Sequence, residues 1–102
     1  MLLTEREQME CDVIANEILA RVLLLTGYER GVLAADRSPG NVRARSQIVA
    51  LMRSCVHPQC AQLSLRRIGR VCGMDVASVR KRIASIDPVA PWSFRESGVA
   101  NG

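Results

Sequence analysis

Three consecutive basic residues, Arg80, Lys81 and Arg82, stand in the segment LSLRRIGRVCGMDVASVRKRIASI at positions 63–86. Guanidinium and ammonium groups bind phosphate oxygens, and they also donate hydrogen bonds to the O6 and N7 acceptors of guanine in the major groove. The chemistry that these residue types indicate is therefore recognition of a polyanion, with Lys81 as the candidate for a base contact and its two neighbours as candidates for phosphate contacts.

A second group of reactive side chains, Cys55, His57 and Cys60, lies in the hexapeptide CVHPQC. Zinc normally takes about four protein ligands, and the usual C-x₂-C pair is absent, so a metal site is only an alternative interpretation. A disulfide between Cys55 and Cys60 is a second alternative, and it would need an oxidising compartment. We expect no cofactor, and because no orienting group accompanies a Cys-His pair we expect no catalysis.

Helical spacing positions the basic residues. Two apolar stripes predict a helix, a tight turn at Gly73 and a second helix. The stripes are Leu65, Ile68 and Val71/Cys72 in the first helix, and Val76, Val79, Ile83 and Ile86 in the second. At about 100° per residue Lys81 lies opposite the second stripe, with Ala77 beside it as a candidate for contact with a thymine methyl group. This is the outline of a helix-turn-helix that places its second helix in a DNA groove.

Charge is strongly segregated along the chain. Residues 1–36 carry seven acidic and three basic side chains, a net charge of −4, whereas residues 37–86 carry ten basic and one acidic side chain, a net charge of +9. Clustered cations gain affinity for phosphates through the release of counterions. The central block therefore favours a nucleic-acid partner.

The other elements follow from caps and breakers. Thr4 and Glu7 predict a capping box that begins an acidic, amphipathic helix ending at Gly27. The expected elements are a helix at about 5–25, a short helical piece at 29–35, a loop at 36–41 around Pro39-Gly40, a basic helix at about 42–55, a loop at 56–62, the helix-turn-helix at 63–86 and an extended tail at 87–102. Trp92 and Phe94 are candidates for pinning part of the tail onto the domain.

The fold class that these elements predict is all-α, a small multi-helix bundle with one domain at 1–86. Only three residues are aromatic, and a core of aliphatic side chains suits packed helices better than a sheet. The longest apolar stretch, Val22 to Leu25, is far shorter than the roughly 20 residues of a spanning helix. We find no secretory signal and expect a cytoplasmic, nucleoid-associated protein with no membrane contact.

Several motifs together resemble a known family. They are V-R-A-R at 42–45, Arg53, S-L-x-x-I-G-R at 64–70, G-M-D at 73–75 and Ser78-Val79. In this spacing they resemble the C-terminal DNA-binding domain of the bacterial replication initiator DnaA, over about residues 25–86. The resemblance implies a Trp-repressor-like helix-turn-helix fold that binds duplex DNA, here as a stand-alone relative because the initiator's ATPase module is absent.

The resemblance also implies further DNA contacts. Arg37 corresponds to the family's minor-groove arginine, Arg43 and Arg45 to its R-A-R, and Arg53 to a residue that contacts phosphate. Val76-Ala77 stand where the family has His-Thr, so binding of the initiator's own box sequence is not implied. Together with the residues that helical spacing selects, the candidate DNA-binding set is Arg37, Arg43, Arg45, Arg53, Arg66, Asp75, Ala77, Ser78, Arg80, Lys81 and Arg82.

Two hypotheses of different class follow. The first is a DNA-binding protein without enzymatic activity, which prefers certain duplex sequences and regulates replication initiation or transcription as a monomer or weak homodimer. The second is an interaction adaptor, whose acidic helix at 5–25 docks a replication or transcription protein while DNA contact is weak or absent.

Overall fold

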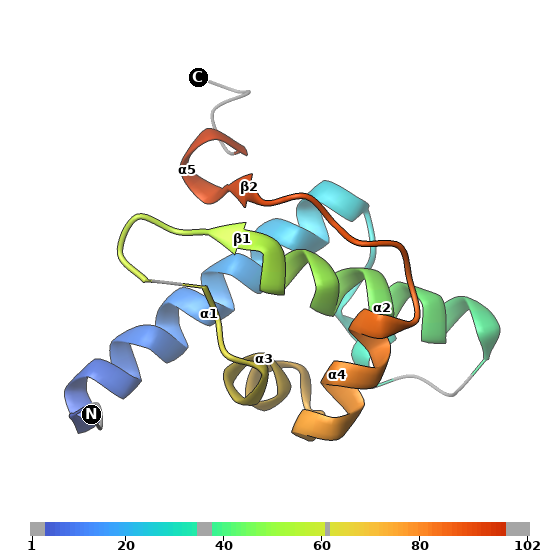
Figure 1. Cartoon of the computed structure of the whole chain (residues 1–102), viewed down its shortest axis with the longest axis horizontal. Coiled ribbons are helices and arrows are strands. Elements are labelled where there is room, and N and C mark those ends of the chain that lie inside the picture. The colour runs from blue at the N-terminus through green and yellow to red at the C-terminus, as the bar shows by residue number, and fades with distance from the viewer. Residues whose placement is uncertain (1–3, 35–37, 61, 98–102) are drawn as a thin grey trace.

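The computed structural model describes residues 4–34, 38–60 and 62–97, and for residues 96 and 97 only the backbone. The elements in chain order are α1 (Glu5–Thr26), the 3₁₀ helix η1 (Arg30–Leu33), α2 (Pro39–Ser54), β1 (Cys55–Val56), α3 (Leu65–Cys72), α4 (Val76–Ala84), β2 (Trp92–Ser93) and α5 (Phe94–Ser97). The described chain is mostly helical, which confirms the expected small helical bundle. In Figure 1, α3 and α4 lie on one side of α2, and β1, β2 and α5 lie on the other.

Helix α1 begins and ends where its caps predict. The hydroxyl of Thr4 accepts a hydrogen bond from the amide of Glu7 at 3.1 Å, and the Glu7 carboxylate accepts one from the amide of Thr4 at 3.1 Å. This reciprocal pair satisfies two amides that have no partner within the helix. Gly27 ends the helix with φ at 79°, a left-handed conformation that glycine adopts without a steric penalty.

Helix α2 corrects the loop predicted at 36–41. Pro39 is the first residue of the helix and Ser38 its N-cap, so Pro39-Gly40 opens the helix instead of lying in a loop. Proline suits this place because its missing N–H would be unpaired there and its φ is already helical. Only the stretch before Ser38 is left to connect η1 to α2.

The core is built around α1 and α2. The buried residues of α1 are all aliphatic, whereas those of α2 also include Arg45 and Ser46. The most buried side chains of the core are Ile18, Leu19 and Val22 of α1, Ile48, Val49 and Met52 of α2, Leu63, Ile68 of α3 and Val79 of α4, each at most 1% exposed. Helices α1 and α2 pack on each other and each also packs on α3, while α4 packs on α2 and α3. The apolar stripes predicted for residues 65–72 and 76–83 thus meet the core.

The connection between α3 and α4 is short and tightly packed. Gly73 ends α3 in the left-handed conformation with φ at 74°, and the amide of Met74 donates to the carbonyl of Gly69 at 2.8 Å. A Cβ atom on Gly69 would lie 2.3 Å from the Met74 carbonyl oxygen. This close approach requires glycine at position 69, and it fixes the angle at which the chain leaves α3.

The C-terminal segment differs from the expected extended tail. Strand β2 pairs in parallel with β1, with Cys55 opposite Trp92 and Val56 opposite Ser93, and α5 follows. The indole Nε1 of Trp92 donates to the carbonyl of Leu51 at 2.7 Å. The guanidinium of Arg21 lies 4.2 Å from the centre of the Phe94 ring. Trp92 and Phe94 therefore pin the segment, as predicted, but the described part of it, residues 87–97, is packed on the domain and adds a two-stranded sheet that composition did not predict.

Helix α4 ends at Ala84, two residues before the predicted end at Ile86. Among the described residues, every helix is too short or too polar to cross a membrane.

Candidate nucleic-acid interface

Helix α4 presents a basic face to solvent. Its buried or half-buried side chains include Val76, Val79 and Ile83, and the opposite face exposes Ala77, Arg80, Lys81 and Ala84. Arg82 is half-buried at the edge between the two faces. Ion pairs among the described residues do not include Arg80, Lys81 or Arg82. The helical spacing thus predicted correctly that Lys81 is exposed, and no described acidic side chain pairs with it.

Asp75 has a structural role at the start of α4. Its carboxylate oxygen Oδ1 accepts a hydrogen bond from the amide of Ser78 at 2.7 Å, so Asp75 is the N-cap of the helix. This hydrogen bond lowers the pKa of the Asp75 carboxyl, because it stabilises the charged form. The side chain is thus engaged with the backbone that starts the basic helix, and Ser78 is half-buried beside it.

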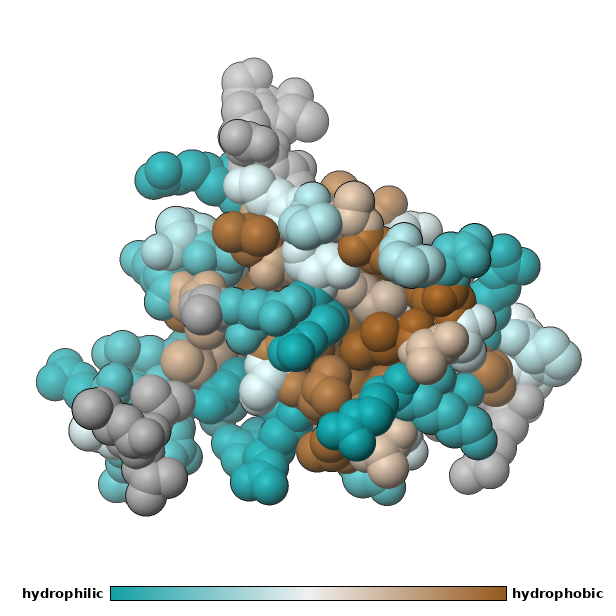
Figure 2. Space-filling view, in the orientation of Figure 1, coloured by the Kyte–Doolittle hydropathy of each residue, from teal (hydrophilic) through white to brown (hydrophobic). Residues whose placement is uncertain are grey.

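Helix α3 adds exposed arginines next to α4. Its N-cap is Ser64, whose hydroxyl accepts from the amide of Arg67 at 3.1 Å. Arg66 and Arg70 of α3 are exposed, whereas the side chain of Arg67 is only 14% exposed. Figure 1 shows α3 and α4 side by side at the lower edge of the molecule, and Figure 2 shows hydrophilic side chains along the same edge. Arg66 thus adds an exposed cation on the helix that packs on α4, whereas Arg70 is exposed but pairs with Asp12 of α1.

Sequence reasoning missed an ion-pair network that joins α1 to α3. The Asp12 carboxylate accepts from Nη1 of Arg67 through Oδ1, and from Nη1 of Arg70 through Oδ2 at 3.2 Å. Arg67 also donates to the carbonyl of Gln8 at 3.1 Å. The opposite charges of residues 1–36 and 37–86 were the signal available in the sequence, but that signal does not say which acid meets which base.

Two arginines that the resemblance assigned to DNA are engaged inside the protein. Arg45 is 7% exposed, and its Nε donates to the carbonyl of Val32 at 2.9 Å, so we remove it from the DNA-facing set. Arg53 is half-buried, and its Nη1 donates to the carbonyl of Leu63. Arg53 thereby holds the segment that leads into α3. Each guanidinium thus uses at least one of its five N–H donors within the protein.

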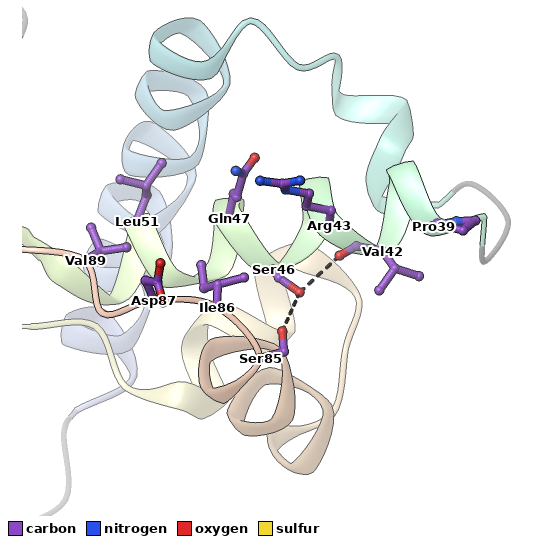
Figure 3. A pocket seen from close by; sticks show the side chains of 10 residues that line it. All are labelled: Pro39, Val42, Arg43, Ser46, Gln47, Leu51, Ser85, Ile86, Asp87 and Val89. Carbon is purple, nitrogen blue, oxygen red and sulfur yellow. Dashed lines mark hydrogen bonds between the residues drawn. The ribbon is translucent and has the colours of Figure 1, made fainter.

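Arg43 is exposed but lies apart from α4. Figure 3 shows Arg43 and Gln47 on the side of α2 away from Ser85, which follows α4. On the opposite side of α2 the Ser85 hydroxyl donates to the Ser46 hydroxyl at 3.1 Å, and Ser46 donates to the carbonyl of Val42. Arg43 and Ser85 therefore lie on different sides of α2, although both line the groove beside it. Arg37, the predicted minor-groove residue, lies outside the described residues.

An open groove runs along α2 beside the end of α4. Its volume is about 740 Å³, and Figure 2 shows hydrophobic side chains gathered over this region. The lining residues are Pro39, Val42, Arg43, Ser46, Gln47, Leu51, Ser85, Ile86, Asp87 and Val89 (Figure 3). The groove is mostly apolar, and Arg43 is one of the residues that line it.

Cys55, His57 and Cys60 of the CVHPQC segment line the same small hollow, but their side chains contact different partners. His57 Nδ1 accepts from the amide of Gln59 at 3.0 Å, and its ring lies 4.8 Å from that of Phe94. Cys55 is buried, while the sulfur of Cys60 lies 3.9 Å from that of Cys11 on α1. The alternative disulfide between Cys55 and Cys60 is therefore not the pairing that the fold favours. Within the described ranges, no three His, Cys, Asp or Glu side chains are placed to hold a metal ion.

Comparison with known proteins yields no match: no family model, no curated protein and no solved structure is similar to this chain. Its function is therefore inferred from its own residues.

Proposed function

We propose that this protein binds double-stranded DNA by placing α4 in the major groove, and that it regulates replication initiation or transcription by occupying its site. Lys81 is the base-reading candidate, and Ala77 lies on the same exposed face. Arg80 and Arg82 flank them as phosphate contacts, and Arg66 of α3 is placed to contact the neighbouring backbone. In this proposal the protein is not an enzyme.

The observation that carries this proposal is the exposed basic face of a helix whose other face is anchored in the core. Val79 is 0% exposed and fixes the rotation of α4 about its axis, so Arg80 and Lys81 point to solvent. The resemblance of the 64–79 motifs to the initiator's DNA-binding domain supports the same orientation. The helix fixes the spacing of the backbone positions that carry these cations, which suits a register of phosphate and base contacts.

The test is fluorescence anisotropy with random-sequence duplexes over a range of salt concentrations. We expect affinity to fall steeply with salt, because each neutralised phosphate contributes a slope of about −0.9 in log K against log salt. Replacing Arg80 and Arg82 by Ala should reduce that slope by roughly one for each phosphate that is no longer neutralised. Selection from a random duplex library should then enrich a motif whose recognition depends on Lys81.

A matched control is Arg43→Ala, which also removes an exposed basic side chain, on the side of α2 away from Ser85. We expect it to change affinity much less than Lys81→Ala does. Wild-type affinity in the triple variant Arg80→Ala, Lys81→Ala, Arg82→Ala, with the fold intact by circular dichroism, would overturn the proposal.

A second candidate function, an interaction adaptor, is favoured by the outer face of α1. Met9, Val13 and Leu24 are 65%, 58% and 78% exposed, and Glu10 and Glu17 lie among them. Large apolar side chains gathered on an exposed helix face are typical of a surface that meets another protein. The acidic flanks suit a partner helix with basic flanks.

The two candidates differ in what a Met9→Glu, Val13→Glu variant loses. The adaptor function predicts that a nuclease-treated pull-down retains a replication or transcription protein with the wild type but not with this variant. It also predicts negligible duplex affinity at physiological salt. Unchanged DNA binding by the variant, together with no retained partner, would instead leave DNA binding as the function.

A further inference from the structure

Two cysteines that are 49 positions apart in the sequence meet at the surface. Cys11 lies on α1 and Cys60 in the loop between β1 and α3, and their sulfur atoms are 3.9 Å apart. Both side chains are half-buried, and both thiols are free. The two sulfurs are in van der Waals contact, and a disulfide between them would need a separation of about 2.05 Å.

We propose that Cys11 and Cys60 form a redox-sensitive pair that oxidises reversibly to an intramolecular disulfide. The sulfurs must approach by about 2 Å for the bond to form. Cys11 is held in the middle of a long helix, whereas Cys60 ends a turn whose hydrogen bond, from the Cys60 amide to the His57 carbonyl, is long at 3.5 Å. The loop therefore makes the adjustment, and α1 need not move.

A small oxidant can reach the pair from two sides. Cys11 lines a surface hollow of about 540 Å³ together with Gln59, and Cys60 lines a separate hollow of about 340 Å³ together with Cys55 and His57. These openings lie on the two flanks of the 57–60 turn. Solvent access is the condition that separates reactive cysteines from structural ones.

The chemistry balances with a hydroperoxide as the oxidant. One thiolate sulfur attacks a peroxide oxygen, the O–O bond breaks, and the sulfur becomes a sulfenic acid while hydroxide leaves and takes up the thiol proton as water. The second thiolate then attacks the sulfenic sulfur, the S–O bond breaks, and a second water leaves. Two thiols are oxidised, one peroxide is reduced to two waters, and a dithiol reductant reverses the reaction by exchange. Burial raises the pKa of the Cys60 thiol, and either sulfur of the pair can make the first attack once it is deprotonated.

The other two cysteines provide an internal contrast. Cys55 is 2% exposed and Cys72 is 4% exposed, and burial raises the pKa of each thiol to about 11. The Cys72 thiol also contacts the sulfur of Met52 at 3.5 Å inside the core. Both thiols are thus protonated at neutral pH, and the sulfur of Cys60 contacts that of Cys11, so we expect oxidation to join Cys11 and Cys60.

The bond would act on the junction between α1 and α3. Cys11 directly precedes Asp12, which holds Arg67 of α3, and Cys60 lies in the loop that leads to the Ser64 cap of α3. A disulfide here closes a long loop in the unfolded chain and adds a covalent tie beside the existing ion pair. Oxidation should therefore raise the melting temperature without changing the helical content.

The experiment is oxidation of the purified protein with hydrogen peroxide, followed by thiol counting under denaturing conditions and by peptide mapping without reductant. We expect the four thiols of the sequence to fall to two, with Cys11 and Cys60 in one linked peptide, and dithiothreitol to restore all four. The melting temperature should rise by several degrees in the oxidised form and return on reduction.

Single variants separate this pairing from the alternatives. Cys11→Ser and Cys60→Ser should each abolish the linked peptide and the rise in melting temperature, while Cys55→Ser should keep both. Cys11→Ser and Cys60→Ser each replace a half-buried side chain. Circular dichroism of both variants therefore checks that they fold. A linked peptide that contains Cys55 or joins two chains, or stable sulfinic acid with no disulfide, would overturn the proposal.

Discussion

The carboxylate of Asp12 on α1 and the guanidinium of Arg67 on α3 form an ion pair between elements that are far apart in the sequence. Arg67 keeps 14% of its side-chain surface exposed and Asp12 31%, so the pair is partly withdrawn from water. An ionic hydrogen bond in such a place contributes more than one on the open surface. This ion pair orients α3, and through α3 it orients α4.

We expect Asp12→Ala to lower the free energy of unfolding by about 1–3 kcal/mol, because it leaves the Arg67 guanidinium partly buried without its partner. Urea denaturation followed by circular dichroism measures this change. The exposed pair of Arg6 and Glu10, at 3.9 Å on α1, offers a control: Glu10→Ala should cost much less. Equal losses in the two variants would contradict the structural role given to Asp12.

Gly69→Ala should destabilise the protein by about 1–3 kcal/mol, since the new Cβ would lie 2.3 Å from the Met74 carbonyl and the turn must shift. The comparison is Gly31→Ala in η1, where a Cβ meets nothing within 4 Å and φ is not positive. Thermal unfolding of both variants separates the two cases. A Gly69→Ala protein as stable as the Gly31→Ala protein would show that the turn tolerates a different path.

Trp92→Phe should lower stability by about 1 kcal/mol, because it leaves the Leu51 carbonyl without the indole hydrogen bond while keeping most of the ring packing. Trp92 is the only tryptophan of the chain, so its fluorescence reports directly on the C-terminal segment. In the wild type we expect the emission shift and the loss of helical signal to share one midpoint. An emission shift that precedes the loss of helix would mean that the segment detaches independently.

The Asp75 cap should make the stability of α4 depend on acid. The hydrogen bond from the Ser78 amide lowers the pKa of the folded-state carboxyl, so its contribution is present above the unfolded value, near 3.8, and is lost as pH falls through the lower folded value. Asp75→Asn keeps a capping oxygen that does not titrate. The difference in melting temperature between wild type and this variant should therefore shrink or reverse between about pH 5 and pH 2, and a difference that is constant over this range would exclude the cap as a titrating group.

Local signals in the sequence predicted most of the helices. Thr4, Glu7 and Gly27 act on neighbours within one turn, and the apolar stripe of Val76, Val79 and Ile83 follows from helical period alone, so each could be predicted without tertiary information. The start of α2 was missed because Pro39-Gly40 suits a turn and a first helical turn equally well. Strands β1 and β2 were missed because two residues carry no detectable alternation.

In the candidate site, the exposure of Lys81 could be predicted because it follows from helical period within one element. Lys81 lies opposite the buried side of its own helix, and the wheel is enough to place it. Arg45 and Arg53 look identical to Lys81 in a count of charge, yet their partners are backbone carbonyls of Val32 and Leu63, which lie 13 and 10 residues away. Composition cannot distinguish a guanidinium that faces solvent from one that serves as an internal hydrogen-bond donor, since both roles suit arginine.

The pairing of Cys55 with Trp92 has a consequence for the order in which the chain folds. The two strands are parallel, and the chain between them includes α3 and α4 before it returns to pair with β1. Pairing between residues so distant in the chain carries a high cost of loop closure, so we expect this one to form after the helices that it encloses. Pairing of β2 with β1 thus ties down the segment that follows α4, and we expect it to do so only after α3 and α4 have packed.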